Sequence, residues 1–309
     1  MGPVLLFMTS PGINFLEDIL HEGLDEVLGP ERVWCFPYKD YSTFQYNLYP
    51  PSPDDRPHRQ PFSLTQLLDQ RNRVAGVIVG SVRKSAVEVW QAIQDYFAGR
   101  PVALVNGEET RPPHWPPVSH TFRFKMDLLP EEMGPDLFPL PLAVPPRVML
   151  PEEVPRDIDV SFVARPTTEA RRRYAEVLER EGFLVILGEG VPREQFCWIL
   201  NRSKISVSLR GAAWDTFRYW EIPYHGALLM SERLPVVIPD DFVDGESAVF
   251  FDSPEDMLAR IRALLGDPGR LARIATNGRR LCREKHTAAA RARYVLGRMG
   301  LAGTFGLTP

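Results

Sequence analysis

Short, continuous apolar runs alternate with segments of helical spacing along most of the chain. The runs at 4–8, 74–79 and 205–209 lack the alternation of a half-exposed strand, so they predict strands buried on both faces of a sheet. Further short strands are predicted at 33–36, 101–105, 159–163, 183–187, 227–230 and 248–251.

Helices are predicted between these strands. After the first run, Phe15, Ile19, Leu20 and Leu24 recur at the spacing that puts them on one helix face. Further helices are predicted at 63–71, 85–97, 169–181, 193–201, 214–225, 253–265, 268–285 and 288–299. Strands that alternate with helices are typical of βαβ units, so the predicted fold class is α/β with Rossmann-like parallel sheets.

The prolines indicate how this fold is divided. Of the 30 prolines, more than half gather at 50–61, 112–117 and 130–155, which predicts two long loops and then an interdomain linker. A chain of 309 residues is long enough for two domains. We expect one Rossmann-like domain at 1–145 and a second at 156–296, facing each other across a cleft. Ligands of open parallel sheets bind beyond the carboxyl ends of the strands, so the site is expected in this cleft.

Composition narrows the classes of partner. The net charge of −4 gives no field that would attract nucleic acid, and no apolar run reaches the ~20 residues of a membrane span. The N-terminus lacks the pattern of a secretory signal. Cys35, Cys197 and Cys282 are widely spaced, which predicts free buried thiols in a reducing cytoplasm and no zinc cluster.

One segment carries a recognisable pattern. Residues 215–230 contain Arg218, the pair Trp220-Glu221, and Gly226 just before an apolar strand. This pattern resembles the C-terminal domain of the CgeB-like (spore-maturation-protein-like) glycosyltransferases, relatives of the group-1 glycosyltransferases in the GT-B superfamily. Further matches follow in order at 240–251, 253–265, 267–278 and 286–291, so the resemblance covers about 157–296 and reaches into 121–145.

The resemblance implies an enzyme that moves a sugar from a nucleotide diphosphate sugar, such as a UDP-sugar, to an acceptor. The acceptor is a glycan, a small molecule or a protein, and neither a metal nor a cofactor is implied. Asp157 and Asp159 spell the DxD metal motif of another glycosyltransferase fold, but they open a strand and are interpreted as linker residues. Two alternatives stay open: a UDP-sugar 2-epimerase, and a non-catalytic binding or assembly protein on the same scaffold. The segment 36–61 could line an acceptor site or cover a homo-oligomer interface.

The same resemblance assigns donor contacts around one helix. Glu221 matches the residue that binds the ribose hydroxyls in related enzymes, and a carboxylate can accept two hydrogen bonds from a vicinal diol. Arg218, one turn earlier, could pair with Glu221 or with phosphate. Gly226 is expected to allow a tight turn and a close approach of the ligand. His225 is interpreted as a satisfied turn residue, and Ala213 stands where many relatives carry a second Glu.

Other cations of the second domain are candidates for the diphosphate. Arg165 follows the first strand of that domain, in a strand-loop-helix turn where free amides and a guanidinium could cradle phosphate; a solvated loop residue is the alternative. Arg210 follows the strand 205–209 on its ligand side, whereas Lys204 precedes it, where a surface or packing role is equally expected. The arginine run 171–173 is interpreted as a solvated helix face.

The first domain is expected to supply the acceptor side and one donor contact. Gly12 lies in the turn after the first strand and is a candidate contact for the nucleotide sugar. Glu109, after the strand 101–105, is the candidate general base, with a solvated loop acid as the alternative. An inverting transfer needs such a base and a retaining transfer does not, and the sequence leaves both open.

Overall fold

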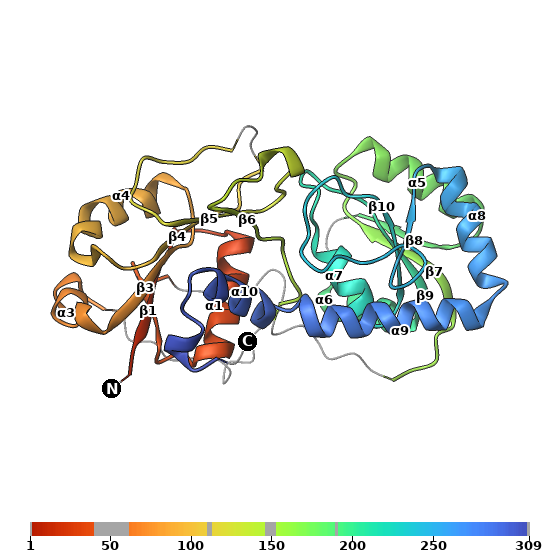
Figure 1. Ribbon diagram of the computed structural model, residues 1–309. Helices are drawn as coiled ribbons and strands as arrows, with labels where there is room; N and C mark the ends of the chain where they lie inside the picture. The colour runs from red at the N-terminus through yellow and green to blue at the C-terminus, as the bar shows by residue number, and fades with distance from the viewer. Residues whose placement is uncertain (1, 40–61, 110–112, 146–152, 189–190, 308–309) are drawn as a thin grey trace. The chain divides into compact units, whose positions relative to one another are not determined.

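The computed structural model describes residues 2–39, 62–109, 113–145, 153–188 and 191–307 (Figure 1). The chain divides into two compact units: Met1–Arg147 with Thr287–Pro309, called the first unit, and Val148–His286, called the second unit. Of the segment 36–61, only residues 36–39 are among the described residues, so its predicted role as an acceptor site or interface lies outside them. None of the helices in the described ranges is both long enough and apolar enough to cross a membrane.

The first unit is built on a six-stranded sheet in the order β2-β1-β3-β4-β5-β6, and every neighbouring pair is parallel. Its strands are β1 (Val4–Met8), β2 (Val33–Phe36), β3 (Val74–Val79), β4 (Val102–Asn106), β5 (Phe122–Lys125) and β6 (Leu137–Pro139). Its helices are α1 (Phe15–Leu28), α3 (Leu64–Asp69), α4 (Lys84–Ile93) and α10 (Ala288–Arg298), with 3-10 turns at Arg71–Arg73, Gln94–Phe97, Pro130–Glu132 and Gly303–Phe305.

The continuous apolar runs form the centre of this sheet. All residues of β1 and β4 are buried, and in β3 only Ala75 is partly exposed. Leu6, Val77 and Leu104 belong to one apolar core with Trp90 of α4. Burial on both faces explains why these strands show no polar alternation.

The apolar pattern does not predict β5 and β6. In β5, two basic residues alternate with two phenylalanines over four residues, and β6 has three residues and ends in Pro139. β6 is the edge strand of the sheet, where a proline is tolerated because the outer side of the strand needs no ladder hydrogen bonds. Residues 137–139 therefore belong to the first sheet, so the prediction of a linker that starts at 130 is wrong, whereas the predicted first domain, 1–145, includes these residues.

The C-terminal residues return to the first unit. α10 packs against α1 (Figure 1). A Cβ on Gly23 would overlap the carbonyl oxygen of Ala288. The buried guanidinium of Arg291 donates to the carbonyls of Pro141 and Leu142 at 3.2 and 3.3 Å. Residues 287–296, which the sequence pattern groups with the second domain, lie in the first unit because α10 buries its apolar face there.

The second unit is built on a five-stranded parallel sheet in the order β11-β10-β9-β7-β8. Its strands are β7 (Ile158–Ala164), β8 (Leu184–Leu187), β9 (Ser203–Ser208), β10 (Leu228–Glu232) and β11 (Val249–Phe251). Its helices are α5 (Glu169–Arg180), α6 (Arg193–Arg202), α7 (Phe217–Tyr224), α8 (Pro254–Leu265) and α9 (Pro268–Lys285).

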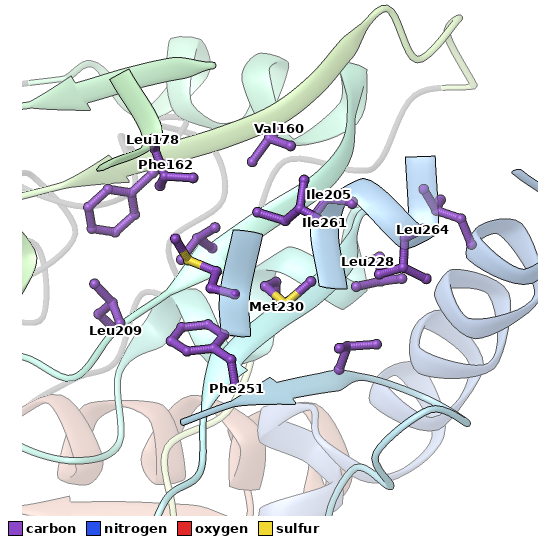
Figure 2. Packing of buried hydrophobic residues seen from close by; sticks show 14 of the residues in the cluster. Val160, Phe162, Leu178, Ile205, Leu209, Leu228, Met230, Phe251, Ile261 and Leu264 are labelled. Atoms are coloured by element: carbon purple, nitrogen blue, oxygen red, sulfur yellow. The ribbon is translucent and has the colours of Figure 1, made fainter. Parts of the chain in front are cut away.

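One apolar core covers a face of this sheet. Figure 2 shows Phe162 of β7 and Ile205 of β9 packed with Ile261 and Leu264 of α8. The helix residues of this core come from α5, α8 and α9. α6 and α7 contact β7, β9 and β10 without contributing residues to this core, as expected for helices on the opposite face.

Helix starts follow the capping signals in the sequence. Thr168, Ser253 and Asp267 each accept a hydrogen bond from a backbone N–H in the first turn of α5, α8 and α9. α7 begins at Phe217, later than the pattern predicts, because the preceding residues form a turn and Thr216 is still extended.

Candidate functional site

The strand order of the second unit reverses at β7. β8 lies on one side of β7, whereas β9, β10 and β11 follow on the other side. Right-handed crossovers that run in opposite directions place their helices on opposite faces, and ligands of such sheets bind where the strand order reverses. A ligand site is therefore expected at the residues that follow Ala164 and Ser208.

Arg171 ties these two strand ends together. It lies in the first turn of α5 and is only 4% exposed. Its Nη1 donates to the carbonyl of Arg165 (3.0 Å) and to Oγ1 of Thr167 (2.9 Å), and its Nη2 donates to the carbonyl of Leu209 (3.0 Å). The sequence prediction of a solvated face holds for Arg172 and Arg173, which are exposed, but is wrong for Arg171.

Arg218 lies beside Arg171, at the second position of α7. Its Nε is buried and has no hydrogen-bond partner among the described residues. Burial lowers the pKa of this guanidinium to about 10; Arg171 lowers it further and Glu221 opposes the shift. The group still carries its charge at neutral pH. Two cations in the first turns of two helices, where the helix dipoles are also positive, form a site that favours an anion.

Glu221 lies one turn further along α7 and is buried. Its Oε1 lies 2.6 Å from Nη2 of Arg193, the first residue of α6; the side chains are 2% and 13% exposed. Arg171, Arg193 and Arg218 are called the arginine cluster: Arg218 interacts electrostatically with Arg171 and Glu221, and Glu221 pairs with Arg193. The carboxylate of Glu232 also acts on Arg171, so three guanidinium groups and two carboxylates leave a net positive charge.

His225 lies one turn after Glu221, at the end of α7. Its Nδ1 is 2.8 Å from Oδ1 of Asn201 on α6, and its buried Nε2 has no partner among the described residues. Burial lowers the pKa of His225 to about 4, so the imidazole is neutral at pH 7. The prediction that His225 is a turn residue with its hydrogen bonds satisfied therefore holds for Nδ1 and not for Nε2.

Gly226 makes the tight turn that its pattern predicts, with a φ of 80°. It precedes β10, so it lies at the amino-end edge of the sheet, opposite the arginine cluster. A Cβ there would lie 2.7 Å from Nη2 of Arg156, whose guanidinium donates to the carbonyls of Leu200, Ser203 and His225. The group that approaches Gly226 closely is therefore the side chain of Arg156, which donates hydrogen bonds to carbonyls at the ends of α6 and α7.

The other predicted cations are spread over both edges of the sheet. The exposed Arg165 follows β7, and its carbonyl is held by Arg171. Arg210 follows β9 and is exposed; its guanidinium lies 4.2 Å from the ring centre of Trp214, and its backbone N–H donates to Glu232. Lys204 opens β9 at the opposite edge and pairs with Asp159 at 2.5 Å. Only Arg165 and Arg210 share an edge with the arginine cluster.

The aspartates of the DxD sequence make ion pairs. Asp157 pairs with Arg202, and Asp159 pairs with Lys204. Within the described ranges, no group of three or more His, Cys, Asp and Glu side chains is placed to hold a metal ion.

Two predicted residues lie in the first unit, at the carboxyl ends of its strands. Gly12 is exposed in the turn between β1 and α1, with a φ of 80°. Glu109 follows β4; partial burial raises the pKa of its carboxyl, Asp127 and Glu108 add to the rise, and Lys125 opposes it. Lys125 is 1% exposed, and its Nζ donates to the carbonyl of Glu108 at 2.5 Å.

Sequence reasoning missed Arg171 and Arg193. For Arg171 a signal exists, because Ala175 and Leu178 follow it at the spacing of the buried face of α5. For Arg193 the only signal is electrostatic: a cation at the first position of a helix opposes the helix dipole unless an anion lies nearby.

Comparison with known proteins finds a family similarity in the second half of the chain. Residues 164–297 match the model of the glycosyl transferase-like family, a range that contains the arginine cluster and Glu221. This match covers less than half of the chain, and it shows a similarity of this part of the chain to that family. A comparison with curated proteins finds no match to the chain.

Solved structures resemble the chain over nearly its full length. Anabaena HepE in complex with UDP and glucose has a TM-score of 0.58 at 9% identity and covers 97% of this chain and 100% of its own. An α-glucosyltransferase in complex with UDP-glucose and DNA containing an abasic site has a TM-score of 0.57 at 10% identity, covering 96% and 99%. A putative UDP-N-acetylglucosamine 2-epimerase from Listeria monocytogenes has a TM-score of 0.53 at 12% identity, covering 100% and 98%.

Similarity at such identities shows the fold. The chain has the GT-B fold, as its two parallel sheets predict. It spans 55% of the length of a longer match, S. aureus TarM, which has a TM-score of 0.47 at 11% identity over 64% of this chain. The predicted enzyme class, a glycosyltransferase, agrees with the family match and with this fold.

Proposed function

We propose that the protein transfers a sugar from a nucleotide diphosphate sugar, with UDP as the first candidate nucleotide, to an acceptor. Arg218 and Arg171 bind the diphosphate and Glu221 binds the ribose hydroxyls. The structures of HepE and the α-glucosyltransferase hold UDP or UDP-glucose, which supports the choice of UDP. The ordered matches at 215–291 favour the CgeB-like branch of the family.

One observation carries this proposal: the unpartnered guanidinium of Arg218. Its Nε is buried, none of the described residues accepts from it, and Arg171 lies close enough to lower its pKa. Two neighbouring cations repel each other, so this arrangement raises the energy of the unliganded protein. An anion with several oxygens satisfies both groups through charge-assisted hydrogen bonds. A diphosphate has this chemistry.

The same charges suit the chemical step. The bond between the anomeric carbon and the diphosphate oxygen breaks, an acceptor oxygen bonds to that carbon, and the acceptor proton goes to a base. Negative charge grows on the leaving diphosphate, and fixed cations and helix N-termini stabilise it where it develops. In this proposal the arginine cluster supplies that charge.

Glu109 is the proposed base for an inverting transfer. Its raised pKa brings the carboxylate closer to the proton affinity that a base needs near neutral pH. Arg165 and Arg210 share an edge with the cluster and are proposed as outer donor contacts, and Gly12 as a contact from the first unit. Lys204 and Gly226 lie at the opposite edge of the sheet and are left out.

Binding of nucleoside diphosphates tests the proposal directly. UDP, GDP and dTDP are titrated calorimetrically into the protein, and at least one is expected to bind. Arg218→Ala should then weaken binding about 10- to 100-fold, the range expected for losing a charge-assisted hydrogen bond. Lys204→Ala is the matched control and should bind as the wild type does.

Two results decide against the proposal. If no nucleoside diphosphate binds the wild type, the donor site does not exist. If Arg218→Ala binds as tightly as Lys204→Ala, the diphosphate does not lie on the arginine cluster.

Incubation with a donor sugar alone separates the proposed transferase from the epimerase alternative. A transferase is expected to leave most of the UDP-sugar intact until an acceptor is added. Release of a free epimer without an acceptor would favour the alternative, and the Listeria structure shows that a protein described as an epimerase can share this fold.

The described cysteines are buried free thiols, which supports a cytoplasmic location.

A further inference from the structure

The first turn of α6 contains a cation in a place that does not favour one. Arg193 is the first residue of this helix, and the preceding Pro192 makes no side-chain capping hydrogen bond. The helix dipole is positive at this end, so a guanidinium here destabilises the helix unless a negative charge offsets it. Glu194 in the same turn is exposed, whereas the buried carboxylate of Glu221 lies 2.6 Å from the guanidinium of Arg193 and offsets its charge directly.

The pair itself is a poor source of stability. The Glu221 side chain is 2% exposed and that of Arg193 is 13% exposed, so both ions have lost most of their water. Buried ion pairs rarely stabilise a fold more than apolar residues of the same shape. Their benefit is a defined geometry, and here the geometry belongs to a carboxylate in the proposed ribose site.

A second contact holds the same two helices in register. Asn201, near the end of α6, pairs with the imidazole of His225, which is one turn beyond Glu221 on α7. Glu221 and His225 are four residues apart, so they share the face of α7 that meets α6. The two contacts together fix the rotation of α7 about its axis, and with it the direction of the Glu221 side chain.

Orientation matters here because so little of Glu221 can be reached. With 2% of the side chain exposed, a ligand touches only the edge of the carboxylate. A rotation of a few tens of degrees would remove that contact. Arg193 also cancels a charge that would repel the diphosphate of the same ligand.

We propose that Arg193 is a positioning residue: it holds the Glu221 carboxylate in the orientation that accepts the ribose hydroxyls and neutralises it toward the diphosphate. His225 and Asn201 support this geometry from the other end of α7. The inference rests on the proposed function, because it assigns the ligand of Glu221.

Discrimination between ribose and deoxyribose measures this role. UDP and 2′-deoxy-UDP are titrated calorimetrically into the wild type, Arg193→Gln and the control Arg202→Gln, which changes the same residue type on the surface of the same helix. If GDP binds in place of UDP, GDP and 2′-deoxy-GDP are used. The wild type and Arg202→Gln should prefer the ribonucleotide by tenfold or more. Arg193→Gln should lose that preference and bind UDP at least tenfold more weakly.

Removing both charges separates positioning from direct contact. In Arg193→Gln/Glu221→Gln both charges of this pair are gone, so no carboxylate is left to repel the diphosphate. Affinity for UDP should therefore be higher than in Arg193→Gln, and discrimination between UDP and 2′-deoxy-UDP should still be absent. If Arg193→Gln does not fold, Glu221→Gln is compared with the double variant, and the two should bind UDP equally. A further tenfold loss in the double variant would mean that Arg193 contacts the ligand itself, which overturns the inference.

The remaining outcomes divide clearly between the two proposals. Ribose discrimination that survives in Arg193→Gln at an unchanged melting temperature refutes the positioning role and leaves the donor site intact. Failure of the wild type to bind any nucleoside diphosphate refutes the proposed function itself.

Discussion

Arg171 differs from its neighbours in the run 171–173 only in the helix face on which it lies. It shares a face with Ala175 and Leu178 and is buried, whereas Arg172 and Arg173 are exposed. Three hydrogen bonds from its guanidinium join the loop after β7 to the end of β9. A residue type that usually marks a surface therefore holds the strand ends at the candidate site.

Arg171→Ala is expected to destabilise the second unit. The substitution leaves the carbonyls of Arg165 and Leu209 without their buried donor, which costs about 2–4 kcal/mol of unfolding free energy. Urea unfolding measures this loss. The control is Arg173→Ala, two residues along and exposed, which should change the free energy by less than about 0.5 kcal/mol. Equal effects of the two substitutions would contradict the structural role of Arg171.

At the scale of elements, a buried charge group joins β1, α1 and the end of β2. Glu17 and Asp18 in the first turn of α1 are fully buried, and both accept from Nζ of Lys39, at 3.0 and 2.6 Å. Ser10, just after β1, donates its hydroxyl to Glu17 at 2.6 Å. Burial raises the pKa of Asp18 to about 7; the charge of Lys39 opposes this shift and Glu17 adds to it.

This raised pKa makes the stability of the first unit depend on pH. The folded protein holds a proton on Asp18 up to about pH 7, whereas the unfolded chain releases it near pH 4. The folded state thus binds more protons in this window, so stability is highest at its acidic end and falls as pH rises. The slope reaches about 1.4 kcal/mol per pH unit for one group.

Asp18→Asn should remove most of this slope. Urea unfolding between pH 4.5 and 8 measures the free energy of the wild type, of Asp18→Asn and of Asp69→Asn, a control at an exposed aspartate of α3. The wild type and the control should both lose stability across the window, and Asp18→Asn should stay nearly level in comparison. Equal slopes of the wild type and Asp18→Asn between pH 5 and 7 would rule out the protonated Asp18. The wild-type slope alone does not decide, because the lowered pKa of His225 makes the stability of the second unit rise with pH up to about 6.5.

At the scale of the whole molecule, the two units do not follow the order of the residues along the chain. Residues 287–309 follow the second unit in the sequence, yet α10 completes the first unit by packing on α1. The close contact of Gly23 with the Ala288 carbonyl and the carbonyls bound by Arg291 hold it there.

Removal of residues 287–309 should therefore unfold the first unit and leave the second unit folded. Calorimetry of the full chain is expected to show the unfolding of two units, because each has its own core. In the shortened protein the contribution of the first unit should be lost or shifted down by well over 10 °C, because α1 loses its apolar partner. Removal of 307–309 alone is the control, and loss of the second unit's transition instead would contradict the assignment.

The family match and the fold similarity cover different parts of the chain. The family match covers 164–297, whereas fold similarity at 9–12% identity covers at least 96% of the chain. The family match therefore lies mainly in the second unit and also includes the first residues of α10. The match does not reach Glu109, so Glu109 and the acceptor remain predictions.

The sequence by itself determines what depends on neighbours along the chain. Apolar runs and helical spacing predict the parallel strands and most helices, because burial on both faces and the helical repeat leave a local pattern. Arg218 and Glu221 are found together for the same reason, since one helical turn joins them. β5 and β6 escape such reasoning because they are short, and only their place at the side of an existing sheet makes them strands.

Tertiary structure alone decides what depends on distant partners. It buries Arg171 between two strand ends, pairs Arg193 with Glu221, turns Gly226 to the edge away from the cluster, and returns α10 to the first unit. No local spacing encodes these facts, because each depends on residues from separate elements whose distance is set by packing. The arginine cluster exists only because a reversal of strand order brings the first turns of three helices to one edge of the sheet.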